Sequence, residues 1–411
     1  MPPPPLPRPD SHRHPIFERF EFQTREGVVC TIGILRQNDG ARCFPDIGSG
    51  AWGKVQVGIN LNEYVGSDAA RGYVAVKTIT FAADDSPRTK RLLSNEIAAL
   101  RLLNSPRPTM PAAVAGHFGQ PSQPQIGHPN VNGYFGYHNP NANQQQINGE
   151  HRILLEPVPG GTLRKFLEWY RRPGGGQRSD YAQRGPDFNL FRSLLIQLCK
   201  GMQYIHRHHI AHRDLKAQNV MITPDHQIKI IDFGLATIKR QDHEFFLSDD
   251  FYHAGSGAYR APEVGMWRGD SGSERVQVHH KHNARQRGGW YDPRAIDCYA
   301  VGFLACEFAA AVFFKDDLYH SVYRLLSHSH ETHILHNVDK NEKSREHVFQ
   351  VFTNPHIQVD RFNMINNPIP ADWRALIRGL LDVDPVGAKI ISHRFLGTIF
   401  YKFLAKIHRI N

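Results

Sequence analysis

Short runs of alternating apolar and polar residues mark several strands in the first part of this chain. Val55-Gln56-Val57 alternates directly after a glycine-rich stretch. Tyr73–Lys77 alternates as well, so that Ala75 and Lys77 fall on one face of a strand. His151–Leu155 is a further apolar run, and a connector rich in proline and glycine follows it. These patterns predict three strands.

A helix is predicted to begin at Ser86 and Pro87. A serine hydroxyl caps free backbone amides, and a proline at the first helical position loses no hydrogen bond. Glu96 is the single carboxylate of the predicted helix. The helix has one apolar face, formed by Leu93, Ile97 and Leu100.

A β-hairpin is predicted near the middle of the chain. Val220–Ile222 and Ile228–Ile231 are apolar runs, and Thr223-Pro224-Asp225 between them is a turn sequence. The polar stretch His212–Asn219 precedes the first run, and Asp232-Phe233-Gly234 follows the second. Since the two ends of a hairpin lie side by side, these polar stretches should meet in space.

The two polar stretches carry the residues of a phosphoryl-transfer site. Such a transfer needs charge around the phosphate oxygens and an attacking hydroxyl held in line, with little covalent chemistry from the protein. Asp214 supplies a carboxylate and Lys216 a cation. Asn219 and Asp232 supply two metal ligands. Either stretch alone is a common turn or charge cluster, but the combination is specific.

At these residues the chain resembles the eukaryotic protein kinases of the Ser/Thr type, from about Phe44 to about Phe403. The resemblance implies an α+β, bilobal protein kinase fold. A small lobe would contain an antiparallel β-sheet plus one helix, a larger lobe would be mainly α-helical, and ATP would bind between them. We expect a disordered Pro-rich tail at residues 1–27, the N-lobe at 28–157 and the C-lobe at 158–411.

The glycine-rich stretch resembles the phosphate flap of these kinases, with the pattern G-x-G-x-x-G-x-V. Glycines let backbone amides approach phosphate oxygens because no Cβ intervenes. A dinucleotide-binding fold is the alternative, but it expects a helix to open inside the glycines, whereas a strand follows here. We therefore expect nucleotide contacts from Ile47, Gly48, Ser49, Gly50, Gly53 and Val55.

The resemblance also assigns nucleotide contacts to a strand and to a connector. Lys77 is expected to hold the α- and β-phosphates and to pair with Glu96. Ala75, on the same strand face as Lys77, is expected to contact the nucleotide. In the connector that resembles the kinase hinge, the backbone carbonyl of Glu156 and the backbone of Val158 are expected to meet the adenine edge.

The same resemblance assigns the chemistry of an ATP-dependent Ser/Thr protein kinase. Asp214 is expected to orient the substrate hydroxyl and accept its proton, and Lys216 to steady the γ-phosphate. Asn219 and Asp232 are expected to hold Mg²⁺, so ATP and Mg²⁺ are the implied cofactors and protein Ser/Thr hydroxyls the acceptors. Lys216 also favours Ser/Thr over Tyr. The expected catalytic set is Asp214, Lys216, Lys77 and Glu96.

Two other functions are compatible with part of this pattern. A pseudokinase scaffold would bind protein partners without turnover, and the intact catalytic set argues against it. A small-molecule kinase is disfavoured by Gly255–Glu263, which resembles the segment that builds the peptide platform of protein kinases. The arginine that usually pairs with Glu263 is replaced by Ala388, with Lys389 next to it. We therefore expect a looser contact at Glu263.

Charge and histidine content suggest nucleic-acid or metal binding, and neither accounts for the main function. The net charge is +10 and Arg268–Gly289 is basic, but the chain has no nucleic-acid fold motif. We expect accessory binding at most. The 25 histidines include His330-Glu331-Thr332-His333, which misses the H-E-x-x-H pattern by one residue. Structural or solvated histidines are therefore expected.

Cysteines, termini and apolar stretches indicate an intracellular protein, cytoplasmic or nuclear, without membrane association. The five cysteines form no close-spaced pair of the metal or redox type. Met1–Pro9 lacks the apolar core of a signal peptide and is compatible with a disordered tail or an SH3-type partner. Tyr299–Phe314 is interrupted by Glu307 and is shorter than the ~20 residues of a membrane span, so we expect a buried core helix. The resemblance implies that Asp297, at its start, braces the catalytic loop.

Three further segments are expected to be mobile loops inserted into the kinase core. They are rich in proline, glutamine, asparagine, glycine or arginine, and such compositions bury too little apolar surface to offset the ordering entropy. The segments are Ser105–Gly127, Asn139–Gly149 and Pro173–Asp187.

Overall fold

Two compact units make up the chain, and each is described by itself. The first comprises Met1–Phe166 and Gln218–Ala236, and the second Leu167–Ala217 and Thr237–Asn411. The computed structural model describes residues 16–23, 29–35, 49–50, 53–61, 73–81, 85, 87–105, 127–139, 149–171, 188–238, 259, 261, 293–313, 352 and 369–381.

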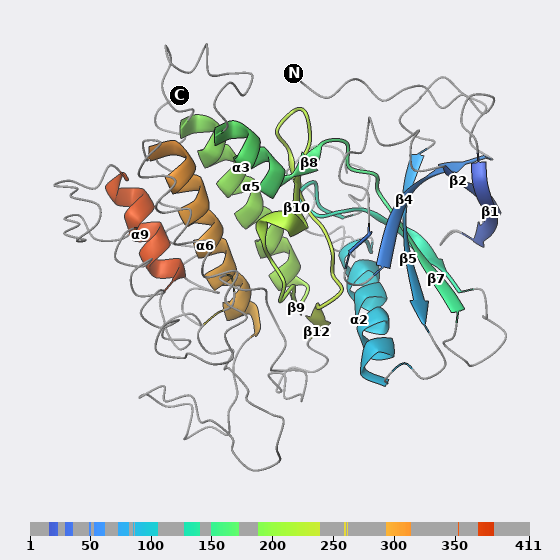
Figure 1. Cartoon of the computed structure of the whole chain (residues 1–411). Coiled ribbons are helices and arrows are strands. Elements are labelled where there is room, and N and C mark those ends of the chain that lie inside the picture. Colours follow the sequence, from blue (N-terminus) through green and yellow to red (C-terminus); the bar gives the residue numbers. More distant parts are fainter. Residues whose placement is uncertain are drawn as a thin grey trace, which may run out of the picture. The chain divides into compact units, whose positions relative to one another are not determined.

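Strands dominate the described part of the first unit, and helices dominate that of the second (Figure 1). The strands are β1 (Ile16–Gln23), β2 (Val29–Leu35), β3 (Ser49–Gly50), β4 (Gly53–Asn60), β5 (Tyr73–Phe81), β6 (Tyr134–His138), β7 (Gly149–Leu155), β8 (Gly161–Thr162), β9 (Ile210–Ala211), β10 (Val220–Ile222), β11 (Ile228–Ile230) and β12 (Thr237–Ile238). The helices are α2 (Pro87–Leu103), α3 (Leu163–Arg171), α5 (Phe188–Arg207), α6 (Pro293–Phe313) and α9 (Ala371–Leu380), with a short 3₁₀ turn at Ala217–Asn219.

An antiparallel sheet in the order β1-β2-β4-β5-β7-β6 forms the frame of the first unit, and β3 pairs with β4 at one end. The three strands predicted from the sequence, two from alternation and one from an apolar run, are confirmed as β4, β5 and β7. In the register of β5, Lys77 lies opposite Val55 on one side and Ile153 on the other. The sheet therefore places Lys77 in its centre, with α2 beside it (Figure 1).

The first strand corrects the expected tail at residues 1–27, because Ile16–Gln23 is strand β1 and pairs with β2. The alternation of this segment puts Phe20 and Phe22 on one buried face. The free energy gained by burying the two rings against the sheet outweighs the tendency of the polar residues between them to stay in water. The cluster they join consists of Phe20, Phe22, Cys30, Ile32, Ile34, Val74, Val76 and Leu154.

Arg152 of β7 fastens this N-terminal hairpin to the sheet. Its guanidinium pairs with Glu18 of β1 and lies 2.8 Å from Glu150. The same guanidinium lies over the ring of Phe20, 4.5 Å from the ring centroid. The sequence pattern contained no sign of this contact, because the partners are separated by more than a hundred residues.

The division into units also differs from the expected lobe boundary between residues 157 and 158. Gln218–Ala236 belongs to the first unit, because strand β11 is bonded to the segment before β6. The amide of Ile230 donates to the carbonyl of Asn130 over 2.9 Å, and the amide of Asn132 donates to the carbonyl of Ile230 over 3.0 Å. Two backbone hydrogen bonds thus join segments about a hundred residues apart.

Helix α6 is the core of the second unit and packs against α5 and α9. Trp373 of α9 contacts the rings of Phe188 and Phe313. A Cβ at Gly302 would lie 2.8 Å from the Cβ of Leu380, so glycine permits the close approach of α6 and α9. Over Ile296–Phe313, α6 is long and apolar enough to cross a membrane, but 94% of this window is buried inside the protein. This burial agrees with the expected core helix.

Several sequence predictions fall on residues outside the described part of the chain. They concern the tract Met1–Pro9, most of the three expected loops, the basic segment Arg268–Gly289, the histidines at 330–333, and Ala388 with Lys389. These stay predictions.

A buried histidine predicts acid sensitivity of the first unit. His151 shares a 2.5 Å hydrogen bond with Tyr137 and meets Phe81 edge-on, and its Nε2 has no partner among the described residues. Burial, and to a lesser degree His138, lowers the pKa of His151. The unfolded chain therefore takes up the proton first as the pH falls below about 6.5, and stability is lost there at up to about 1.4 kcal/mol per pH unit.

We expect His151→Phe to flatten this part of the pH dependence, measured as the free energy of unfolding in urea between pH 7 and 5. Some slope should remain, because burial also lowers the pKa of His138. Identical slopes for the variant and the wild-type protein would contradict the assignment.

Candidate active site

Lys77 is the centre of a buried ion cluster in the first unit. Its Nζ lies 2.7 Å from Glu96 Oε1 and 2.9 Å from Asp232 Oδ1. The side chains of Lys77 and Glu96 are only 8% and 3% exposed. Burial alone would lower the pKa of Lys77, but the two carboxylates outweigh it and raise the pKa. Lys77 is thus held as a cation, and the predicted pairing with Glu96 is confirmed.

A cavity of about 490 Å³ lies beside this cluster, with Glu96 and Gly234 in its lining. A Cβ at Gly234 would lie 3.3 Å from Asp232 Oδ1. A side chain there would crowd the carboxylate, so glycine leaves Asp232 open on this side. Most of the remaining lining comes from β4, β5 and α2, and Glu18 of β1, Asp85 and Glu150 of β7 complete it.

The described part of the glycine-rich stretch forms a hairpin. Ser49 pairs with Lys54, and Gly50 with Gly53. Gly53 has a φ of +137°, and a Cβ at this position would lie 2.4 Å from the carbonyl oxygen of Thr78. No other residue type fits both conditions. Val55 and Ala75 lie on β4 and β5 as predicted, whereas Ile47 and Gly48 lie outside the described residues.

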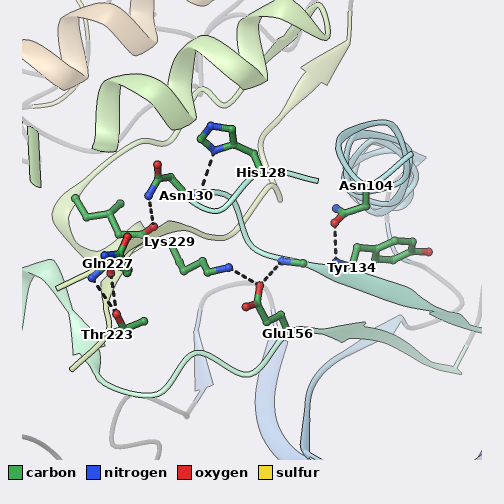
Figure 2. Close-up of polar contacts among 10 residues, drawn as sticks. Asn104, His128, Asn130, Tyr134, Glu156, Thr223, Gln227 and Lys229 are labelled. Atoms are coloured by element: carbon green, nitrogen blue, oxygen red, sulfur yellow. Dashed lines mark hydrogen bonds and ion pairs between the residues drawn. The ribbon is translucent and has the colours of Figure 1, made fainter. Parts of the chain in front are cut away.

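The connector after β7 begins with Glu156, whose side chain is fixed by two donors (Figure 2). Glu156 Oε2 accepts from the amide of Gly133 at 3.0 Å and from Lys229 Nζ at 2.8 Å. The amide of Glu156 donates back to the carbonyl of Gly133 over 2.9 Å. Val158, two residues later, is buried. Both residues expected to meet adenine are therefore in an ordered connector.

The hairpin of β10 and β11 brings the two expected metal ligands to neighbouring positions. The amide of Ile231 donates to the carbonyl of Asn219 over 3.0 Å, so the two ends of the hairpin meet as predicted. Asp232 adopts a φ of 64°. Among the described residues, no group of three or more His, Cys, Asp or Glu side chains could hold a metal. One carboxylate and one amide fit Mg²⁺, which takes its remaining ligands from phosphate and water.

The second unit carries the stretch expected to be the catalytic loop, and the polar core of this stretch is Asp297 of α6. This buried carboxylate accepts from the amide of His212 at 2.8 Å, the amide of Arg213 at 2.7 Å and His206 Nε2 at 2.9 Å. Arg213 has a φ of 66°, an uncommon conformation for a non-glycine residue. The three hydrogen bonds hold the loop in this conformation and confirm the expected brace.

Asp214 follows directly and forms an ion pair with Lys216, with 2.8 Å between Lys216 Nζ and Asp214 Oδ2. A further contact holds the end of this loop. The amide of Ala217 donates to Tyr259 Oη over 3.3 Å, and this hydroxyl donates to Glu307 over 2.8 Å. Glu307, the charge that interrupts the apolar stretch of α6, therefore has a specific buried partner.

The structure brings together Lys77, Glu96 and Asp232 in one unit and Asp214 and Lys216 in the other. Sequence reasoning missed three supporting residues: His206, Asn130 and Lys229. Each acts on a partner many positions away along the chain, such as His206 on Asp297. A lone polar residue in an amphipathic helix or a short strand contains no signal for such a partner.

Comparison with known proteins agrees with this geometry. Residues 123–387 match the family model of the protein kinase domain. The chain is similar to the serine/threonine-protein kinase HAL5 of Candida glabrata, with 29% identity over 223 residues, 51% of this chain and 24% of that protein. It is also similar to the serine/threonine-protein kinase chk-1 of Caenorhabditis briggsae, with 38% identity over 125 residues, 30% of this chain and 22% of that protein.

A third relative is the mitogen-activated protein kinase kinase kinase YODA of Arabidopsis thaliana, with 26% identity over 220 residues. The match covers 53% of this chain and 19% of that protein. In all three cases the chain spans about a quarter or less of the relative's length.

Asp297→Asn should destabilise the second unit. The amide group replaces one acceptor oxygen with a donor, which then faces another donor in a fully buried place. We expect a loss of about 2–4 kcal/mol in the free energy of unfolding, measured in urea. A change below about 0.5 kcal/mol, the scale of ordinary surface substitutions, would show that the brace is dispensable.

Proposed function

This chain belongs to the protein kinase family, and on that basis we propose that it transfers the γ-phosphoryl group of ATP to Ser and Thr hydroxyls of protein substrates. The observation that carries the proposal is the buried Lys77 held between Glu96 and Asp232. The family match begins at residue 123, so Lys77 and Glu96 precede it. Their geometry therefore supports the proposal independently of that match.

Lys77 would hold the α- and β-phosphates. Two carboxylates keep it charged and fix its position, so little reorganisation is needed when phosphate oxygens arrive. Glu96 connects this position to helix α2, and Asp232 connects it to the end of the β10–β11 hairpin. The described flap residues would add backbone amides around the phosphates, as the glycine at position 53 permits.

Asp214 would accept the proton of the substrate hydroxyl. Lys216 pairs with this carboxylate and would steady the transferred phosphoryl group. Asp297 keeps the loop in shape through backbone amides, so it acts by positioning and does not touch the substrate. Asn219 and Asp232 would hold Mg²⁺, which neutralises charge on the phosphates.

A scaffold that binds partners without turnover is the competing function. In a scaffold without turnover, Lys77, Glu96 and Asp232 would have no phosphate or metal to position, whereas here the three charged groups are all present and paired. The complete cluster therefore favours catalysis.

Asp214→Asn should abolish phosphoryl transfer and leave ATP binding largely intact. The carboxylate acts on the hydroxyl and not on the nucleotide, and loss of a general base typically costs about 10²–10⁴-fold in rate. The measurement is transfer of labelled phosphate from ATP to a degenerate Ser/Thr peptide library. Asp225→Asn, the same change in an exposed turn, is the control. Wild-type turnover by the Asp214 variant would disprove the role.

The substrate preference should not depend on arginine three residues before the target site. Basophilic members of the family carry acidic residues at the positions of Thr162 and Gln218, and neither residue here is acidic. The hydroxyl of Thr162 is moreover occupied, because it accepts from the amide of Lys165 at 3.3 Å. A library profile dominated by arginine at that position would contradict this expectation.

A further inference from the structure

The carboxylate of Glu156 forms a polar cluster that the proposed reaction does not use directly. It receives hydrogen bonds from Lys229 Nζ and from the amide of Gly133, at 2.8 and 3.0 Å. The backbone amide of the same residue donates to the carbonyl of Gly133 over 2.9 Å. Glu156 is thus held at both its backbone and its side chain.

The ion pair in this cluster is partly shielded from water. The side chains of Lys229 and Glu156 are 16% and 35% exposed. Fully exposed ion pairs contribute little, because water and salt screen them and two long side chains must be ordered. Here the amide of Gly133 already orders the carboxylate of Glu156. The ion pair therefore costs only the conformational entropy of the Lys229 side chain.

The strand that carries Lys229 pairs with β10 along one edge and is held by Asn130 along the other. Asn130 Nδ2 donates to the carbonyl of Ile228 over 3.0 Å, and the amide of Ile230 donates to the carbonyl of Asn130 over 2.9 Å. Figure 2 shows Asn130 against this strand and the Lys229 side chain reaching Glu156. The segment that holds β11 also contains Gly133, so Lys229 and Gly133 are two points of one rigid support.

We propose that Lys229 is a positioning residue for the adenine base. It holds the carboxylate of Glu156 and thereby fixes the backbone carbonyl of Glu156, the group expected to meet the adenine edge. This inference rests on the proposed function, because only a bound nucleotide makes the position of that carbonyl matter. Lys229 itself has no role in proton transfer or phosphate binding.

The position predicts a specific pattern of affinities. Loss of Lys229 should weaken ATP and adenosine by the same factor, because both carry the base. Lys77→Arg, which keeps the buried positive charge but displaces the group that meets the phosphates, should weaken ATP more than adenosine, because only ATP has phosphates. A merely structural role of Lys229 would lower the melting temperature without this matched loss.

The experiment measures binding of a fluorescent ATP analogue and its displacement by ATP and by adenosine. For Lys229→Met we expect both dissociation constants to rise about three- to tenfold, the scale of one partly exposed charge-assisted hydrogen bond. Lys229→Arg keeps the charge and should restore most of the affinity. Lys200→Met, the same change at an exposed position of α5, is the control.

A second variant tests the same ion pair from its other side, so that the inference stays testable if Lys229→Met does not fold. Glu156→Gln keeps the side-chain volume and an acceptor for Gly133, but it removes the charge that Lys229 contacts. It should reproduce the loss of adenosine affinity, and the double variant Glu156→Gln with Lys229→Met should be no weaker than either single variant. Melting temperatures of all variants show that each is folded.

The outcomes separate this inference from the proposed function. If the wild-type protein binds no ATP analogue, the proposed function fails and the inference falls with it. If the wild type binds and Lys229→Met keeps its adenosine affinity, only the inference fails. A higher turnover of Lys229→Met would also overturn it, because the cluster would then restrain the enzyme instead of positioning the base.

Discussion

The buried charge of Lys77 is the constraint on which the rest of the first unit depends. A lone ammonium in this place would cost several kcal/mol, and only well-placed opposite charges repay that cost. Glu96 and Asp232 lie at 2.7 and 2.9 Å and come from two separate segments. Helix α2 and the end of the β10–β11 hairpin must therefore both reach the centre of the sheet. One cation thus determines the position of three elements.

The second unit also contains a buried charge that needs partners, in this case one anion. Asp297 is fully buried, and it is satisfied by two backbone amides and an imidazole nitrogen. The stretch proposed as the catalytic loop has its shape because the amides of His212 and Arg213 must point at one carboxylate. In both units a charge in the core imposes order on a loop that has few apolar residues of its own. The residues proposed for the chemistry are therefore held by the same contacts that stabilise each unit locally.

The N-terminal hairpin of β1 and β2 adds two strands to the sheet before the glycine-rich stretch begins. Apolar side chains of β1 and β2 form one buried cluster with those of β5 and β7, and Arg152 ties β1 to β7, the strand that leads into the connector. Close approach is possible at β6 because Gly136 has no Cβ, where one would lie 2.2 Å from the ring of Phe22. The family model matches residues 123–387 and leaves this hairpin outside the match.

Local sequence patterns determined much of the fold and pointed to the main candidate site residues. Alternation predicts β4 and β5, and an apolar run predicts β7. A serine and a proline predict the start of α2, and the turn at Thr223-Pro224-Asp225 predicts the β10–β11 hairpin. These features depend on neighbouring residues, so a short window contains the information. Lys77, Glu96, Asp214 and Asp232 were recognisable because their motifs are equally local.

Only the tertiary structure decided which distant residues meet. Lys229 and Glu156 are 73 positions apart, and His206 and Asp297 are 91 positions apart. The sequence predicts a tail at Phe20 and Phe22, because the burial of these rings depends on a sheet whose other strands come later in the chain. The free energy of such contacts comes from burial and from pairing across the whole fold. The neighbours of a residue along the chain therefore do not specify which distant residue it will contact.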